Sequence, residues 1–386
     1  MRYRVPWLAA LLSLTLLAAA CGDPALDHGD YALTPVAGEY DEVPSRARGI
    51  AVESVRIGER LVYADRIDPD LTHSEGGGVV AGVRGVNDML SGAQRMALDP
   101  FDVLAGFGAI GSNGVSGDEQ REKYLSIVIV ALPDEAQADA AARAMAAADF
   151  EANLANAPLP VPEFPAALSH WRPGVPTVGS WLVWKNLVIR VFAKVLEPRA
   201  EVLTDLLTRT YRAQLAELDT FVPTPAAEVA NLQMDADALL TKVVKTGDHW
   251  PDRWDFMVYG ARSFALLLDR PADRLREFEE AQISAVAVSY DKFLHRAGDS
   301  AAARTFAERE EEALLADDYT VTSAAVSKLD GVSCYRAGRP KTTVDAPRRF
   351  ACLVRHNEFV VRMYGNQESD LWQQAAAQYA LLGGTW

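Results

Sequence analysis

The chain has 386 residues, of which 49% are hydrophobic and 9% aromatic, so it can bury a large core, and its length favours two domains. Without residues 1–20, which hold two arginines and no acid, the 38 basic residues fall to 36 against 53 acidic ones, a balance of −17. Proteins that bind nucleic acid or anionic lipid through charge need a basic surface, so this composition argues against both classes.

Residues 1–20 have the three parts of a secretory signal: two arginines, an apolar run over 7–17 and three alanines. Cys21 follows directly, in a pattern that resembles the lipobox of bacterial lipoproteins, although Ala18 stands where Leu is usual. An ordinary signal and a membrane-spanning helix are the alternatives, but the apolar run is about half of the ~20 residues that a bilayer needs. We therefore predict a signal peptide over 1–20 and acyl chains, such as palmitate, on Cys21. They would anchor the protein to the cell membrane on its extracytoplasmic side.

Residues 21–50 lack an apolar period and are rich in Gly, Pro and Asp, which predicts a flexible tether behind the acylated N-terminus. A flexible chain of this length would hold the folded part on the order of 30 Å from the membrane. Tyr31 and Tyr40 are unusual in a linker, so part of the tether is expected to dock on the first domain.

The first domain is predicted over 51–222. Residues 124–132 are apolar and β-branched, as in a buried strand, and Asp134 can cap the Ala-rich helix that follows to about residue 152. A hairpin then turns at Lys185–Asn186, and a helix over 198–219 presents apolar residues at helical spacing.

Three segments in the second half match the first half in the same order, which favours an internal duplication. They are 258–268 with 80–90, 300–306 with 139–145, and 352–364 with 181–192. This alignment makes Trp181 equivalent to Cys352 and predicts a second hairpin turn at His356–Asn357. Likeness of composition alone, between Ala-rich helices and Val-rich strands, is the alternative.

Two prolines interrupt the helical pattern after residue 222, so we place a connection over 223–235 and the second domain over 236–386. Each copy contains strands, a helix, a hairpin and a closing helix. The predicted fold class is therefore α+β, with two similar domains that each pack an antiparallel sheet with helices.

Acylation of one of the three cysteines leaves an even pair, Cys334 and Cys352, each near the middle of a predicted strand. Adjacent antiparallel strands can place two such side chains opposite each other, within disulfide geometry. A disulfide in the second domain alone is the prediction, and two buried free thiols are the alternative.

Three segments resemble the uncharacterised two-domain lipoproteins of mycolic-acid-bearing actinobacteria, a family of unknown function. They are LDHGDY at 26–31, FVPTP…MDADALL at 221–240, and the closing CLVRHNEFVVRMYGNQESDLWQQAAAQYALLG at 352–383. The resemblance implies an exported, acyl-anchored envelope protein with a paired fold. It implies no catalytic residue, because the family has no assigned chemistry.

Motifs for catalysis, cofactors and metals are weak. GFGAIG at 106–111 has the glycines of a dinucleotide loop but is followed by more loop-like sequence, so a flexible loop is the better interpretation. Residues 65–70 lack the Gly and distal Glu of a calcium loop. The histidines have no metal-ligand spacing: His28, His73, His170, His249, His295 and His356. We therefore predict no catalytic residue, no cofactor and no metal site.

Residues 248–256 contain Trp250, Arg253 and Trp254, which could form an aromatic and cationic binding surface. Packing of the two domains against each other is the preferred explanation of the tryptophans. The leading function is a non-catalytic envelope lipoprotein that binds a partner protein, a lipid, a glycan or another wall component, in a crevice near 223–255. The alternative is an envelope hydrolase whose site is assembled from residues distant in sequence.

Overall fold

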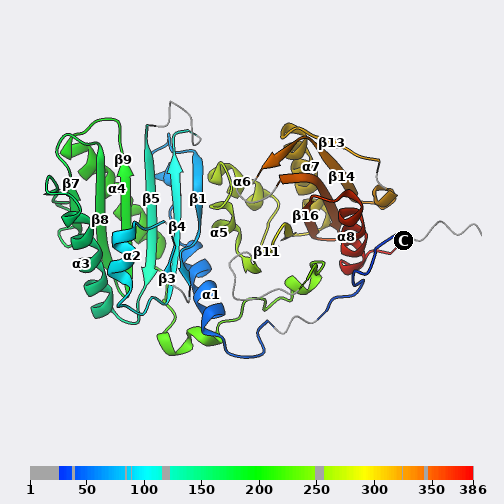
Figure 1. Cartoon of the computed structure of the whole chain (residues 1–386), viewed down its shortest axis with the longest axis horizontal. Coiled ribbons are helices and arrows are strands. Elements are labelled where there is room, and N and C mark those ends of the chain that lie inside the picture. The colour runs from blue at the N-terminus through cyan, green and yellow to red at the C-terminus, as the bar shows by residue number, and fades with distance from the viewer. Residues whose placement is uncertain are drawn as a thin grey trace, which may run out of the picture.

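The computed structural model describes residues 26–36, 40–82, 85–87, 89–114, 122–247, 256–323, 325–342 and 347–385. The signal peptide, Cys21 and the proposed binding residues Trp250, Arg253 and Trp254 lie outside these ranges. Two sheets with their helices lie side by side along the long axis of the molecule (Figure 1). Among the described residues, no helix is both long and apolar enough to cross a membrane.

Within the residues that the structure describes, the first sheet has seven strands, and every neighbouring pair is antiparallel. In spatial order they are β1 (His73–Val79), β4 (Ala105–Ser112), β5 (Tyr124–Ala131), β9 (Leu187–Lys194), β8 (Thr177–Trp184), β7 (Leu168–Trp171) and β6 (Ala157–Pro158). A separate small hairpin contains β2 (Ala81–Gly82) and β3 (Gly85–Val86). The segment GFGAIG is therefore part of strand β4, and its interpretation as a loop was wrong.

The described part of the second sheet also has seven antiparallel strands. They are β10 (Phe256–Tyr259), β11 (Ala285–Ser289), β12 (Lys292–Arg296), β16 (Phe359–Gly365), β15 (Pro347–His356), β14 (Val332–Thr342) and β13 (Tyr319–Val321). When strands are numbered within each sheet, both sheets follow the order 1-2-3-7-6-5-4. The shared order confirms the predicted pair of similar α+β domains.

Each domain has at least one helix between the first and second strands of its sheet, one after the third strand and one after the last, and the first domain also has a helix before its first strand. The first domain has α1 (Arg46–Gly58), α2 (Gly92–Leu98), α3 (Glu135–Glu151) and α4 (Ala200–Leu218), and the second has α5 (Ala261–Ala265), α6 (Pro271–Glu280), α7 (Ser300–Ala316) and α8 (Glu368–Leu381). Short 3₁₀ turns are η1 (Ala64–Arg66), η2 (Ala226–Asn231), η3 (Leu240–Lys242) and η4 (Ala325–Lys328). Helices α3 and α7 each begin after the third strand of their sheet, and their N-caps, Asp134 and Asp299, accept bonds from backbone N–H groups of the first turn.

The two helix layers of the first domain divide the side chains of each strand between them. Val128, Val130 and Trp181 belong to the buried cluster that contains α3, whereas the intervening Ile127 and Ile129 belong to the cluster that contains α4. Because successive side chains of a strand point to opposite faces, the nearly continuous apolar run of β5 is explained by burial on both faces.

The second hairpin turn lies one residue later in the chain than the predicted alignment places it. Trp184 pairs with Leu187 around the predicted turn, but His356 pairs with Phe359, so the second turn is at residues 357–358 and not at His356–Asn357. Lys185 and Asn357 both have positive φ, 53° and 50°, and hold equivalent turn positions. Matching identical letters shifted the alignment by one residue.

Because of this shift, Trp181 and Cys352 are not equivalent, and their side chains lie on opposite faces of their sheets. Trp181 packs in the α3 cluster, whereas Cys352 packs in the cluster that contains α8. Ser180 is the true equivalent of Cys352, because a slip of one residue in a strand exchanges the two faces.

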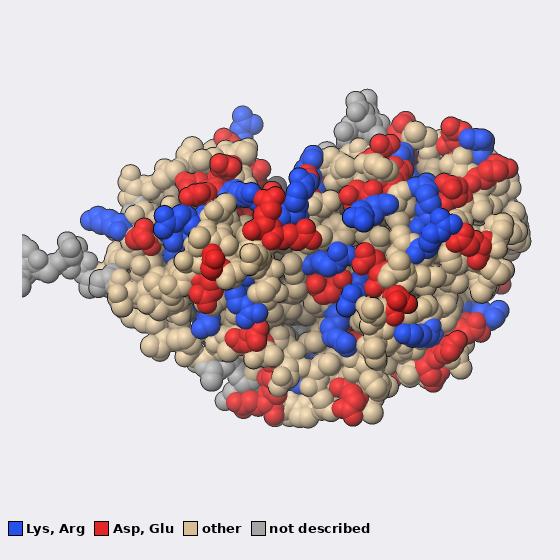
Figure 2. Space-filling model, turned by 180° about the vertical axis from the view of Figure 1, so that it is seen from behind, with Lys and Arg blue, Asp and Glu red and all other residues tan. Residues whose placement is uncertain are grey.

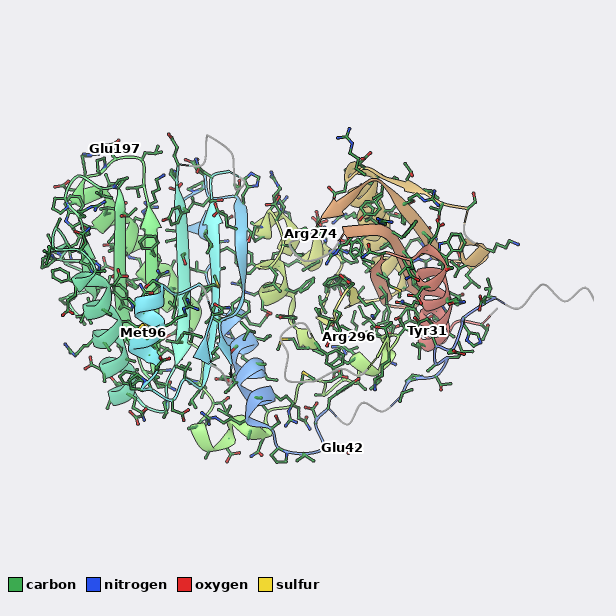
Figure 3. The ribbon with its side chains drawn as sticks, in the orientation of Figure 1. Tyr31, Glu42, Met96, Glu197, Arg274 and Arg296 are labelled. Carbon is green, nitrogen blue, oxygen red and sulfur yellow. A yellow bond between two sulfur atoms is a disulfide. The ribbon has the colours of Figure 1, made fainter. Side chains whose placement is uncertain are left out.

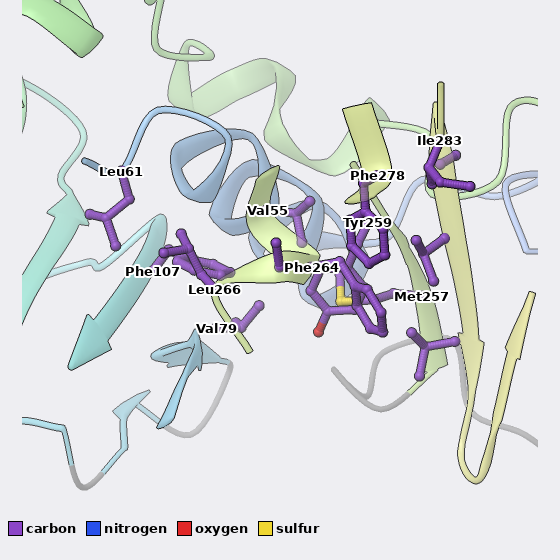
Figure 4. Close-up of a cluster of buried hydrophobic side chains, with 14 of the residues drawn as sticks. Val55, Leu61, Val79, Phe107, Met257, Tyr259, Phe264, Leu266, Phe278 and Ile283 are labelled. Atoms are coloured by element: carbon purple, nitrogen blue, oxygen red, sulfur yellow. The ribbon is translucent and has the colours of Figure 1, made fainter. Parts of the chain in front are cut away.

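The buried core is continuous across both domains. The largest cluster joins Val55 and Phe107 of the first domain to Phe264 and Leu266 of the second (Figure 4). A β-carbon on Gly77 of β1 would lie 3.0 Å from the carbonyl oxygen of Leu266, so glycine there permits the backbone of the second domain to approach the edge strand.

Hydrogen bonds reinforce this contact. The Glu59 Oε1 atom accepts the N–H of Ser263 at 2.6 Å, and the Arg262 Nε atom donates to the carbonyl of Glu59 at 3.0 Å. The Tyr63 hydroxyl donates to the carbonyl of Arg262 at 2.8 Å. The two domains therefore share a packed and hydrogen-bonded interface.

The N-terminal segment packs on the second domain, as Figure 3 shows for Tyr31, and the predicted docking on the first was wrong for the side chains of Tyr31 and Tyr40. The Tyr31 hydroxyl donates to Asp370 of α8 at 2.6 Å, and the Tyr40 ring meets Phe256 edge-on at 5.2 Å. The segment predicted as tether also includes the first turn of α1, which begins at Arg46.

Arg48 explains this ordering. Its side chain is buried and donates to carbonyls on both the N-terminal segment and the connection between domains, those of Tyr40, Val43, Ala230 and Leu232. A buried guanidinium needs such partners. Arg48 therefore holds the N-terminal segment against the connection.

Candidate functional site

A pocket of about 140 Å³ lies between the domains, and we call it the interdomain pocket. Figure 2 shows a notch between the two halves, bordered by acidic and basic side chains. The apolar lining of the interdomain pocket includes Leu71, Leu125 and Ile127 of the first domain and Leu266 of the second. Its polar lining includes His73, Arg270, Asp273 and Arg276.

The charges at the mouth of the interdomain pocket largely neutralise one another. The Arg270 Nε atom lies 2.6 Å from one oxygen of Asp273, and Arg276 pairs with the other oxygen. The hydrogen bond from Arg270, with the help of Arg276, lowers the pKa of Asp273 below its usual range. Asp65, which also lines the pocket, has a pKa raised by burial.

The described lining residues do not assemble an activated nucleophile. The Ser74 hydroxyl donates to the carbonyl of Leu266 at 3.4 Å, and the His73 Nδ1 atom pairs with Asp269 at 3.2 Å. A nucleophilic serine needs a base within hydrogen-bond reach. In the described ranges, no three His, Cys, Asp or Glu residues are grouped as a metal site would require.

The interdomain pocket is not at the predicted crevice, because none of its lining comes from residues 223–255. The described part of that connection is used for packing: the carboxylate of Asp235 accepts the N–H groups of Leu239 and Leu240 at 2.7 and 2.9 Å. Burial raises the pKa of Asp235 to about 6. The proposed surface at Trp250, Arg253 and Trp254 stays a prediction.

The lining of the interdomain pocket was missed in the sequence because it combines segments almost 200 residues apart. One available signal was HSEGGGV, the sequence of β1, where three glycines in a strand indicate close backbone approach. That pattern locates a contact, but it does not name the partner segment, residues 266–276.

The predicted disulfide is present. Cys334 and Cys352 are directly paired residues of β14 and β15, with their Cα atoms 4.1 Å apart. In the first domain, the equivalent pair is Ser169 and Ser180, whose hydroxyl oxygens lie 2.5 Å apart. The cross-link belongs to the second domain alone, as the cysteine positions predicted.

A buried ionic cluster lies between α6, α7 and the second sheet, and it too was missed. Glu310 is fully buried and pairs with Arg274 of α6 and with Arg362 of β16, the latter at 2.6 Å. Burial opposes ionisation, but the two guanidiniums lower the pKa of Glu310 to about 2. His295 lies nearby, and burial lowers its pKa to about 4.

The rings around this cluster are Phe278, Phe293 and Phe306. A buried ion pair enclosed by aromatic rings fixes two helices on a sheet, and it offers no open position to a ligand. We therefore assign the ionic cluster to the architecture of the second domain.

Comparison with known proteins gives a family. No curated protein matches the chain. The extracellular domain of PknH from Mycobacterium tuberculosis is similar to 49% of this chain and to 97% of its own length, at 14% sequence identity and a TM-score of 0.28. Residues 40–234 match the N-terminal domain of unknown function DUF7373, and residues 239–385 match the corresponding C-terminal domain. The chain belongs to the DUF7373 family, whose function is unknown.

Proposed function

We propose that the protein is a non-catalytic lipoprotein of the cell envelope that binds the apolar part of a ligand in the interdomain pocket. The observation that carries the proposal is an apolar lining contributed by both domains, with a mouth of balanced charge. Apolar concavities with a few polar groups at domain boundaries are the usual sites of ligand binding.

The volume limits the ligand. A cavity of about 140 Å³ is close to the ~150 Å³ that accommodates a benzene-sized molecule, and it is well below the ~300 Å³ at which drug-sized ligands begin. An aromatic ring or a short run of methylenes fits. The polar remainder of a lipid, wall component or partner protein would stay at the mouth, among Arg270, Asp273 and Arg276.

The proposed location in the cell envelope rests on the lipobox-like sequence that ends at Cys21 and on the disulfide, which is typical of exported proteins. Acyl chains supply the membrane attachment, because a mature chain with a net charge of −17 gains nothing from anionic lipid and does not attract nucleic acid. Detergent partitioning tests this part. The protein with Cys21→Ala is expected to stay in the aqueous phase, and entry into the detergent phase like wild type would mean that the anchor lies elsewhere.

Binding is tested with N-phenyl-1-naphthylamine, a neutral probe whose phenyl ring has the size that the interdomain pocket accommodates. Its naphthylamine group would rest at the mouth, and its emission rises in apolar surroundings. Ala272→Trp, at the second position of α6, should fill the interdomain pocket and reduce the rise in emission. Ala301→Trp, at the second position of α7 and exposed, is the matched control and should leave the emission unchanged. Equal emission from both variants would reject the pocket as the site.

A further inference from the structure

A second concavity, of about 240 Å³, opens on the α3 side of the first sheet. We call it the Asp149 hollow. Its lining combines the end of α3 and the loop after it with β7, β8 and β9: Asp149, Asn153, Arg172, Thr177, Gly179 and Phe192. None of these residues lines the interdomain pocket, so the two sites are separate.

A fixed pair of polar side chains forms the base of the hollow. The Asp149 Oδ2 atom lies 3.0 Å from the Nε2 atom of His170, and its Oδ1 atom accepts the side-chain amide of Gln94 at 2.8 Å. The His170 side chain is only 8% exposed, whereas 23% of the Asp149 side chain remains exposed. The carboxylate is therefore held in place and still reaches the solvent.

Aromatic rings hold the histidine in position. The His170 ring stacks on Trp181 at 5.5 Å and meets Phe150 edge-on at 5.4 Å. Burial opposes ionisation of Asp149, but the bonds from His170 and Gln94 lower its pKa below the usual value. Asp149 is thus a preorganised acceptor, because each carboxylate oxygen has lone pairs beyond those already used.

The second domain shows the same positions without a hollow. By strand pairing, Tyr335 replaces His170, Ala351 replaces Gly179 and Tyr364 replaces Phe192. Counting from the N-caps of α3 and α7, Leu314 replaces Asp149. Leu314, Tyr335 and Ala351 form a closed apolar cluster of the second domain. The fold therefore does not require a polar concavity here.

Gly179 keeps the hollow open. A β-carbon on this residue would lie 3.1 Å from Asp149 Oδ2 and 3.1 Å from the Trp181 ring. The residue is in an ordinary strand and has no positive φ, so its backbone conformation does not demand glycine. Space beside the carboxylate is the physical reason for glycine at this position.

The lining indicates the chemistry of a ligand. Asp149 accepts hydrogen bonds, Arg172 donates them, and Asn153 and Thr177 can do both. One carboxylate and one guanidinium balance in charge, which favours a neutral ligand. The Phe192 ring supplies an apolar wall. A sugar ring combines these requirements, because its hydroxyls both donate and accept while its C–H face is apolar.

We propose that the first domain binds a single neutral sugar unit of a glycan in the Asp149 hollow. A volume of about 240 Å³ suits one ring and not a chain of several, so the rest of the glycan would extend into solvent. The proposal is independent of the apolar ligand in the interdomain pocket, and either site could exist without the other.

The test is saturation-transfer difference NMR on the mature full chain with methyl glycosides of glucose, mannose, galactose and arabinose. We expect transfer to at least one of them. Gly179→Ala should weaken that signal at least tenfold, because the methyl group enters the space beside Asp149. Ala351→Gly, the reciprocal change in the second domain, is the matched control and should leave the signal unchanged.

Asn153→Ala guards against misfolding of the glycine variant, because Asn153 is exposed at the rim, where its side-chain oxygen accepts the N–H of Ala155 at 2.9 Å in an exposed hydrogen bond. It should weaken binding severalfold in a folded protein whose thermal unfolding shifts by no more than about 5 °C. Absence of transfer to all four glycosides would overturn the proposal. Transfer that survives both Gly179→Ala and Asn153→Ala would overturn it as well, since the sugar would then bind elsewhere.

Discussion

The two domains share one strand order but use the face beneath α3 and α7 differently. In the first domain this face carries the Asp149 hollow, and in the second it is closed by an apolar cluster and braced by the Glu310 cluster. Arg190 and Arg362 hold equivalent strand positions, yet only Arg362 has a carboxylate bonded to it among the described residues. The same fold thus supports an open polar site in one copy and a sealed ionic core in the other.

The cross-strand position of the disulfide shows the same division. Cys334 and Cys352 form a covalent link, whereas Ser169 and Ser180 share a hydrogen bond to which the Tyr211 hydroxyl adds another at 2.6 Å. The second domain is therefore the more strongly cross-linked copy. Exchanging residues between equivalent positions is the most direct way to test what each copy requires.

The largest expected effect comes from Glu310→Met, which places in the second domain the residue found at the equivalent position, Met145, of the first. Arg274 and Arg362, whose side chains are each only 14% exposed, would lose the Glu310 carboxylate, and Arg274 would keep its pair with Glu277. The free energy of unfolding in urea should fall by about 3–5 kcal/mol. Met145→Leu is the control and should cost less than about 1.5 kcal/mol. Equal losses would show that the ionic cluster is not required.

Acid should destabilise the second domain through His295. Its pKa in the folded protein is about 4, below the ordinary 6.5, so the unfolded chain binds the proton more tightly. The free energy of unfolding that depends on neutral His295 is fully present above pH 6.5. It falls by roughly 3 kcal/mol as the pH decreases towards 4. Replacement by the residue of the first domain, His295→Val, should flatten the stability profile between these values. An unchanged slope would mean that another group titrates there.

Reduction of the disulfide should cost about 3 kcal/mol, because it releases the closure of a loop that spans 18 residues. The reciprocal change, Ser169→Cys with Ser180→Cys, should form a new cross-link in the first domain. Tyr211→Phe should accompany it, since the tyrosine hydroxyl loses its acceptor. Mass spectrometry without reductant detects the linked peptides. Two free thiols in the folded variant would contradict the equivalence of the two strand pairs.

A smaller effect is expected from the N-terminal segment, whose Tyr31 packs on the second domain. Tyr31→Phe removes the hydroxyl that bonds to Asp370, at a cost of about 1 kcal/mol. Amide exchange over residues 26–36 should accelerate roughly fivefold. Tyr40→Phe, whose hydroxyl makes no hydrogen bond to the described residues, is the control. Unchanged exchange in Tyr31→Phe would show that ring packing, and not the hydrogen bond, holds the segment.

Much of the fold could be predicted because apolar periodicity is local. The strand at 124–132, the cap at Asp134 and the hairpin at Lys185–Asn186 all follow from neighbouring residues. The one-residue error at the second hairpin shows the limit of that approach. Letter matching cannot detect which face a side chain takes, whereas the turn geometry at Asn357 fixes it.

The candidate sites could not be predicted because their parts meet only in the folded chain. Asp149 and His170 come from different elements, and the interdomain pocket joins residues near 70 with residues near 270. The docking of the N-terminal segment depends on carbonyl groups that Arg48 bonds, and a sequence does not reveal free carbonyls. Composition indicated a tether because polar residues are common both in tethers and in docked loops.

The central claim, that the two domains together hold a ligand, is tested most directly by hydrogen–deuterium exchange of the full chain with and without N-phenyl-1-naphthylamine. The account predicts slower exchange in residues 62–74 of the first domain and in residues 266–276 of the second, at the same probe concentration. Ala272→Trp should remove both changes together. Slower exchange in one domain alone, or at neither segment, would contradict a shared site.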